Sequence, residues 1–189
     1  MATAPKRPDD DLPRGMNVES FLEWMEPRRE RYELHDGAVV AMAPERVGHI
    51  ATKGRVYRVL YQAVRAGNLP CHVMPDGVAV HVSDRKWYQP DALVYCGPLA
   101  SDQAMKIDNP IIIVEVLSPS TGHIDEGAKL IGYFSLPSVQ HYLIVNPEGL
   151  PLVHHQRQSN DTTLTRIVAG GSLRLDPPGI AIDVTELFN

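Results

Sequence analysis

The stretch Ile111-Ile112-Ile113-Val114-Glu115-Val116-Leu117 and the earlier run Pro90-Asp91-Ala92-Leu93-Val94-Tyr95 each place one carboxylate in an otherwise apolar segment. Both runs are typical of strands that are buried on both faces. A buried carboxylate is very costly unless a cation or a metal compensates its charge. Asp91 and Glu115 are therefore the first candidates for chemistry.

The two acids are expected to meet at one edge of a sheet. Asp91 lies near the start of its strand and Glu115 near the end of its own, so antiparallel pairing would bring the carboxylates together. Hard cations such as Mg²⁺ bind carboxylate and carbonyl oxygens and keep several waters. Two acids and the carbonyl of Val116 would suffice as the protein's share of such a metal site.

A helix predicted over residues 123–135 adds a lysine to this region. One stripe at i, i+4 spacing carries Asp125, Lys129 and Tyr133. Lys129 could orient a metal-bound water or neutralise a phosphate in the transition state, or it could form only a surface ion pair with Asp125. The predicted apolar face of the same helix consists of Ile124, Ala128, Ile131 and Phe134.

The remaining patterns predict an α+β domain with most strands in meanders and two helices packed on the sheet. Residues 1–16 have the composition of a flexible tail, and 17–189 are expected to form a single domain. Asp36-Gly37 is a strong hairpin signal. Further helices are predicted over 17–26 and 47–66, and further strands over 71–74, 78–82, 142–145, 152–156, 162–168 and 180–184.

Composition limits the classes of function. No apolar run approaches the roughly 20 residues of a membrane helix, and no secretory signal is present, so a cytoplasmic protein without a membrane partner is expected. Cys71 and Cys96 lack a metal-type spacing and are expected to be buried thiols. The net charge of −5 argues against nucleic-acid binding by bulk electrostatics. A local basic face, or merely a solvated one, is predicted for the second helix from Lys53, Arg55, Arg58 and Arg65.

The order of motifs resembles the Uma family of restriction-endonuclease-like proteins, part of the PD-(D/E)xK nuclease superfamily. The resemblance covers residues 18–156, and its motifs are Tyr32 to Gly37, Pro90-Asp91, Val114 to Thr121, and Asp125 with Lys129 and Tyr133. It implies a restriction-endonuclease-like core, with a mixed, mostly antiparallel sheet flanked by helices and extra β-hairpins. It also implies an endonuclease that hydrolyses nucleic acid, with DNA the expected substrate, by a water activated on Mg²⁺ or Mn²⁺ held by Asp91 and Glu115.

The resemblance also implies roles for single residues. The superfamily's usual lysine lies two residues after the acid, where this chain has Leu117, and Lys129 matches the lysine of the following helix. Glu33 matches an additional acid of related nucleases, although a glutamate just before a turn is common on strand surfaces. His49 matches a family histidine that could contact a phosphate or a metal-bound water, or it is a helix-start residue without a catalytic role.

Other functions remain open from the sequence. A catalytically silent member of the same fold could bind nucleic acid or a protein. A β-rich protein with a small molecule in its barrel would leave Asp91 and Glu115 as ion-pair partners. A zinc site is disfavoured, since His154 and His155 are adjacent on a strand and point to opposite faces. A homodimer is compatible with cleavage of both strands of a duplex, which requires two active sites or two events.

Overall fold

The computed structural model describes residues 11–117, 124–149, 151–159 and 161–189. The chain forms two compact units. Unit 1 comprises the described residues up to Pro44 together with His81–Tyr88, and unit 2 comprises Glu45–Val80 and Gln89–Asn189. That residues 17–189 act as a single domain stays a prediction.

Unit 1 is built around a tight hairpin. Asp36 and Gly37 have positive φ angles of 52° and 83°, as the two-residue turn that the sequence predicts requires. Pro13 and Met16 form backbone hydrogen bonds with this hairpin, so they belong to unit 1 rather than to a free tail, and residues 1–10 lie outside the described part. The elements are α1 (Val18–Met25), β1 (Tyr32–His35), β2 (Ala38–Ala41), β4 (Val80–Ser83) and β5 (Lys86–Tyr88), with sheet order β2-β1-β5-β4.

Unit 2 contains a six-stranded sheet in the order β10-β9-β8-β7-β6-β3. All neighbours pair antiparallel except β7 and β8, which run parallel and are connected through α3 (Ile124–Ser135). The mixed, mostly antiparallel α+β fold is therefore confirmed. The strands are β3 (Cys71–Pro75), β6 (Ala92–Cys96), β7 (Pro110–Val116), β8 (His141–Val145), β9 (Leu152–Arg157) and β10 (Thr163–Val168). A second hairpin, β11 (Ser172–Leu175) and β12 (Ile180–Asp183), is followed by η2 (Val184–Leu187).

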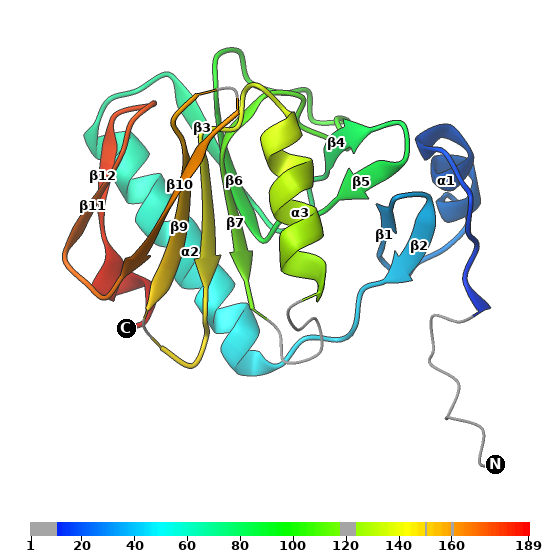
Figure 1. Ribbon diagram of the computed structural model, residues 1–189, viewed down its shortest axis with the longest axis horizontal. Coiled ribbons are helices and arrows are strands. Elements are labelled where there is room, and N and C mark those ends of the chain that lie inside the picture. The colour runs from blue at the N-terminus through cyan, green and yellow to red at the C-terminus, as the bar shows by residue number, and fades with distance from the viewer. Residues whose placement is uncertain (1–10, 118–123, 150, 160) are drawn as a thin grey trace. The chain divides into compact units, whose positions relative to one another are not determined.

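Two helices cover opposite faces of this sheet (Figure 1). Alternate residues of a strand point to opposite faces. Val114 and Val116 of β7 join one core with Val56 and Leu60 of α2 (Val47–Ala66). Glu115, between the two valines, instead contacts α3. The strand β7 is thus enclosed on both sides, as its apolar sequence predicts.

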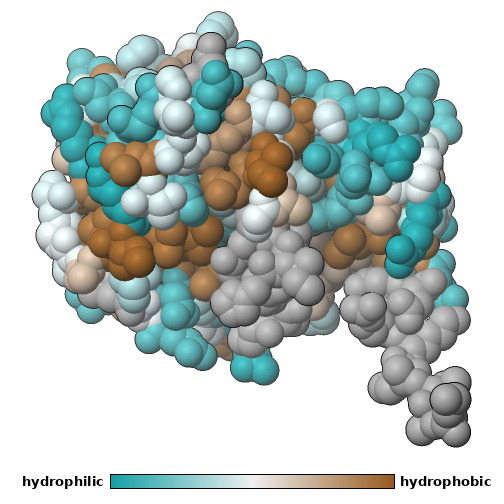
Figure 2. Space-filling view, in the orientation of Figure 1, coloured by the Kyte–Doolittle hydropathy of each residue, from teal (hydrophilic) through white to brown (hydrophobic). Residues whose placement is uncertain are grey.

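The face that α3 turns toward the sheet differs from the predicted one. Ile131 is 71% exposed and Ala128 is also exposed, whereas Tyr133 is fully buried. The prediction of an inward apolar stripe is wrong because the sheet presents Glu115 to this helix, and Lys129 and Tyr133 supply its hydrogen-bond donors. Figure 2 shows apolar residues left on the surface of this face, over α3 and over the β9–β10 edge.

Cys71 and Cys96 form a disulfide, so the prediction of free buried thiols is wrong. Antiparallel pairing of β3 with β6 places the two residues directly opposite each other. Side chains of directly opposed residues lie within reach of a covalent bond. The disulfide therefore ties the terminal strand β3 to its neighbour.

No helix in the described ranges is long and apolar enough to cross a membrane.

Two histidines are buried together between β8 and β9. His141 Nδ1 lies 2.9 Å from His154 Nε2, and both residues are 0% exposed. Burial, above all, lowers the pKa of each to about 4. Only one of these two facing nitrogens can carry a proton, which it donates to the other. Both histidines are therefore stable in the neutral form.

The folded protein should lose stability as pH falls from about 6.5 to about 4. In this pH range the two histidines of the unfolded chain bind protons, whereas the buried pair of the folded protein stays neutral. Each histidine should contribute a slope of at most about 1.4 kcal/mol per pH unit. Urea unfolding at several pH values measures this slope. The double variant His141→Asn/His154→Asn should show a shallower one, and equal slopes for both proteins would contradict this role of the pair.

Candidate active site

The end of β7 is where the two predicted acids lie. The strand β6 runs antiparallel to β7, with Ala92 opposite Val114, as the sequence predicts. The backbone N–H of Asp91 donates to the Val114 carbonyl at 3.0 Å. The Val116 N–H donates in turn to Asp91 Oδ2 at 2.6 Å. Asp91 is therefore fixed against the last residues of β7.

The second oxygen of Asp91 meets a lysine from α2. Lys53 Nζ lies 2.6 Å from Asp91 Oδ1 and 2.9 Å from Asp76 Oδ2, and it also donates to Glu45 Oε1. The Lys53 side chain is only 8% exposed. Oxygens of these three carboxylates lie within 4.8 Å of one another. We call Glu45, Asp76 and Asp91 the carboxylate cluster.

Electrostatics keeps Lys53 charged inside the carboxylate cluster. Burial alone would lower the pKa of Lys53, but the attraction of Asp91 and the hydrogen bonds to all three carboxylates outweigh burial and raise it. For the Asp91 carboxyl the effect of burial is the opposite: burial raises its pKa, and the positive charge of Lys53 acts to lower it. Removal of either partner of such a buried ion pair would leave an uncompensated buried charge and strongly destabilise the fold.

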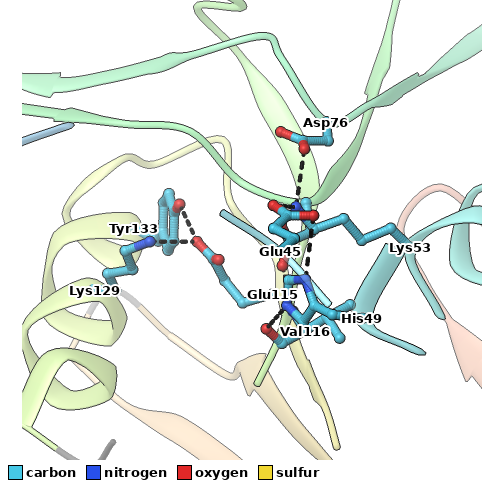
Figure 3. Close-up of polar contacts among 9 residues, drawn as sticks. Glu45, His49, Lys53, Asp76, Glu115, Val116, Lys129 and Tyr133 are labelled. Atoms are coloured by element: carbon cyan, nitrogen blue, oxygen red, sulfur yellow. Dashed lines mark hydrogen bonds and ion pairs between the residues drawn. The ribbon is translucent and has the colours of Figure 1, made fainter. Parts of the chain in front are cut away.

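His49 links the carboxylate cluster to the strand end (Figure 3). Its Nε2 lies 2.9 Å from the Val116 carbonyl oxygen, and its Nδ1 lies 3.3 Å from Glu45 Oε2. The histidine occupies the first turn of α2, one turn before Lys53. The structure thus brings together three of the predicted site residues: Asp91, His49 and Val116.

Glu115 makes a separate group on the other face of the sheet. Its Oε1 accepts from Lys129 Nζ at 3.1 Å and from Tyr133 Oη at 2.7 Å. Figure 3 shows its side chain directed toward α3, away from Lys53 and Glu45. Lys129 therefore reaches the strand end that the helix spacing predicted. Among the described residues, the carboxylates close enough to share one ion are those of Glu45, Asp76 and Asp91, and Glu115 does not belong to this group.

Glu33 belongs to unit 1. It is 5% exposed, and its Oε2 lies 2.7 Å from His35 Nε2. It is thus not the solvated strand residue that its place before a turn also allowed. Its participation in catalysis stays a prediction.

Sequence reasoning missed Glu45, Lys53 and Asp76. The prediction that Lys53 belongs to a basic or solvated surface of the helix is wrong, because Lys53 lies on the buried face of α2. The available signal was its spacing: Lys53, Val56, Leu60 and Val64 share one stripe at i, i+3, i+7 and i+11. A lysine in an apolar stripe implies a buried anion partner. Asp76 follows Pro75 in a turn, and nothing local distinguished it from an ordinary turn residue.

A pocket of about 420 Å³ opens beside the carboxylate cluster. Its lining combines charged groups, Lys53 and Asp76 among them, with apolar groups and a helix glycine, Gly54. An added Cβ at Gly54 would meet no atom within 4 Å. The remaining lining residues are Glu45, Ile50, Tyr57, Pro75 and Asp91. A ligand in this pocket would lie directly against the carboxylates.

Comparison with known proteins adds a family to this geometry. Residues 18–185 match the Uma2 family, described as "Putative restriction endonuclease". Two uncharacterized proteins of Synechocystis sp. are similar along most of their length: slr1290 is 27% identical, covering 92% of this chain and 91% of that protein, and sll1609 is 21% identical, covering 85% and 92%. A crystal structure titled as a "putative nuclease belonging to DUF820" from Anabaena variabilis superimposes with a TM-score of 0.70 at 15% identity, over 92% of this chain and 97% of that one. That structural likeness concerns the fold.

Proposed function

Because the chain belongs to the Uma2 family of restriction-endonuclease-like proteins, we propose that it is a Mg²⁺- or Mn²⁺-dependent endonuclease that hydrolyses phosphodiester bonds of DNA. The family and the fold are those of restriction-endonuclease-like nucleases. The metal dependence and the choice of DNA are the proposed parts.

The carboxylate cluster is the observation that carries this proposal. Three carboxylates within 4.8 Å of one another, beside a pocket and at the end of a buried strand, form a donor set suited to a hard divalent cation. We assign Asp91 as the central ligand, since it is 5% exposed and held by the backbone of β7. The carbonyl of Val116 is a further proposed ligand from the same strand. Glu115 faces Lys129 and Tyr133 of α3, so it is proposed as a catalytic residue and not as a ligand of this ion. A divalent cation would supply Lewis acidity, activating water and stabilising the leaving oxygen.

The protein's own residues would position these groups. His49 holds the Val116 carbonyl by donating from Nε2. Lys129 and Tyr133 fix the orientation of Glu115, so Lys129 is proposed to act mainly on turnover. The catalytic role of Glu33 is proposed on the family resemblance alone. A homodimer would provide two sites for cleavage of both strands and is part of the same proposal.

Purified protein should nick supercoiled plasmid DNA only when Mg²⁺ or Mn²⁺ is present. Asp91→Ala, Glu115→Ala and Lys129→Ala should each reduce the rate at least 100-fold, because each removes a group proposed to bind metal or to stabilise the transition state. Isothermal titration with Mn²⁺ should show weaker binding for Asp91→Ala and nearly unchanged binding for Lys129→Ala.

Lys106→Ala is the matched control, since Lys106 is a partly exposed lysine paired with Asp108, and the rate of this variant should equal that of the parent protein. Nicking that persists without divalent metal, or in all three site variants, would refute the proposed nuclease. DNA binding without cleavage would instead favour a silent member of the family.

Filling the pocket should impair cleavage without harming the fold. Gly54→Leu adds a side chain in open space that lines the pocket, and leucine favours a helix over glycine by roughly 0.8 kcal/mol. We expect an unchanged or raised melting temperature and at least a tenfold loss of kcat/KM on DNA. Gly48→Leu, on the same helix and equally free of contacts but outside the pocket, should keep its activity. Equal activity in the two variants would place substrate binding elsewhere.

A further inference from the structure

The ammonium of Lys53 contacts one oxygen of each of the three carboxylates. Its Nζ contacts Asp91 Oδ1, Asp76 Oδ2 and Glu45 Oε1. The other oxygen of Asp91 is taken by the Val116 N–H. A cation that binds Asp91 through Oδ1, on the side of Glu45 and Asp76, meets the ammonium there, so the two cations compete for one place.

The formal charges leave room for such an exchange. Three carboxylates around one ammonium carry a net formal charge of −2. A divalent cation in place of the ammonium would reduce the charge among the carboxylates to −1. If the Lys53 ammonium stayed in place, its charge a few ångströms from the divalent cation would strongly oppose metal binding, because the effective dielectric of a buried site is low.

His49 provides an observation that is independent of the acids. The Val116 carbonyl can only accept a hydrogen bond, so Nε2 of His49 carries the proton that it donates there. In the neutral imidazole Nδ1 then bears a lone pair. That nitrogen is buried, has no hydrogen-bond partner among the described residues, and lies 3.3 Å from Glu45 Oε2. The side chain as a whole is 10% exposed.

A buried imidazole nitrogen without a hydrogen-bond partner, 3.3 Å from a carboxylate oxygen, is unfavourable unless a cation or a proton lies with them. The arrangement is the usual one of a metal-binding histidine, whose second nitrogen donates to a backbone carbonyl that fixes the tautomer. Imidazole nitrogen is a poor ligand for Mg²⁺ and a better one for divalent transition ions. The donor set of this site is thus mixed, with carboxylate oxygens and one imidazole nitrogen.

We propose that Lys53 is a built-in placeholder for a divalent transition ion, which displaces its ammonium and is bound by Glu45, His49 Nδ1, Asp76 and Asp91. This inference rests on the proposed function in that it uses the same site. It adds the histidine ligand, the preference for Mn²⁺ over Mg²⁺ and the competition with Lys53.

Metal titration of the full chain tests the competition. Isothermal titration with Mn²⁺ should show at least tenfold tighter binding to Lys53→Gln than to the parent protein, whereas Lys106→Gln, an equal change of charge at a partly exposed lysine, should bind as the parent does. His49→Gln should lose at least tenfold in Mn²⁺ affinity and less than threefold in Mg²⁺ affinity. Unchanged or weaker Mn²⁺ binding by Lys53→Gln would overturn the placeholder role.

Lys53→Gln leaves three carboxylates without a cation, which destabilises the fold. A second measurement therefore uses the parent protein. Pulsed EPR of the parent protein with bound Mn²⁺ should show coupling to an imidazole nitrogen, and His49→Gln should abolish it. Absence of that coupling would overturn the histidine ligand even if Lys53→Gln failed to fold.

The outcomes separate this inference from the proposed function. Plasmid cleavage without tighter Mn²⁺ binding by Lys53→Gln would sustain the nuclease and reject the placeholder. Mn²⁺ binding with the expected variant pattern and nitrogen coupling, but without cleavage, would sustain the placeholder and reject the nuclease.

Discussion

Two carboxylates at the end of β7 need cationic or hydrogen-bonding partners, and the surrounding helices of unit 2 supply them: Glu115 belongs to β7 and is partly buried, and Asp91 is buried beside it. On the α2 face Asp91 is matched by Lys53, and on the α3 face Glu115 is matched by Lys129 and Tyr133. Removing one partner of a buried pair costs roughly 3–5 kcal/mol. The orientation of each helix on the sheet therefore follows from charge as well as from apolar contact.

Local signals predicted much of this fold. Asp36-Gly37 needed only its turn chemistry to form a hairpin. Residues 47–66 lie between Pro44 and Gly67, and α2 has these bounds. The positions of the two acids on consecutive strands predicted that Asp91 would lie beside the end of β7, as it does, but the predicted meeting of the two carboxylates is not observed, because Asp91 pairs with Lys53 and Glu115 with Lys129. These features depend on short stretches of chain or on one simple pairing rule.

What could not be predicted depends on partners distant in sequence. The sequence of α3 offers two stripes, and only the presence of Glu115 on the covered face decides that Lys129 and Tyr133 turn inward. Lys53 is separated by 38 residues from Asp91 in the numbering, and its burial is apparent only when β6 lies beside α2. The bond between Cys71 and Cys96 likewise required the register of β3 against β6.

The dual use of α2 ties the hydrophobic core to the candidate site. Val56, Leu60 and Val64 pack into the core from the same helix that carries His49 and Lys53. One inserted or deleted residue between Lys53 and Val56 would turn one set relative to the other by about 100°. Substitutions in this segment can be compensated by neighbours, but a change in its length cannot. Between residues 49 and 64, natural variation in chain length should therefore be suppressed even where side chains vary freely.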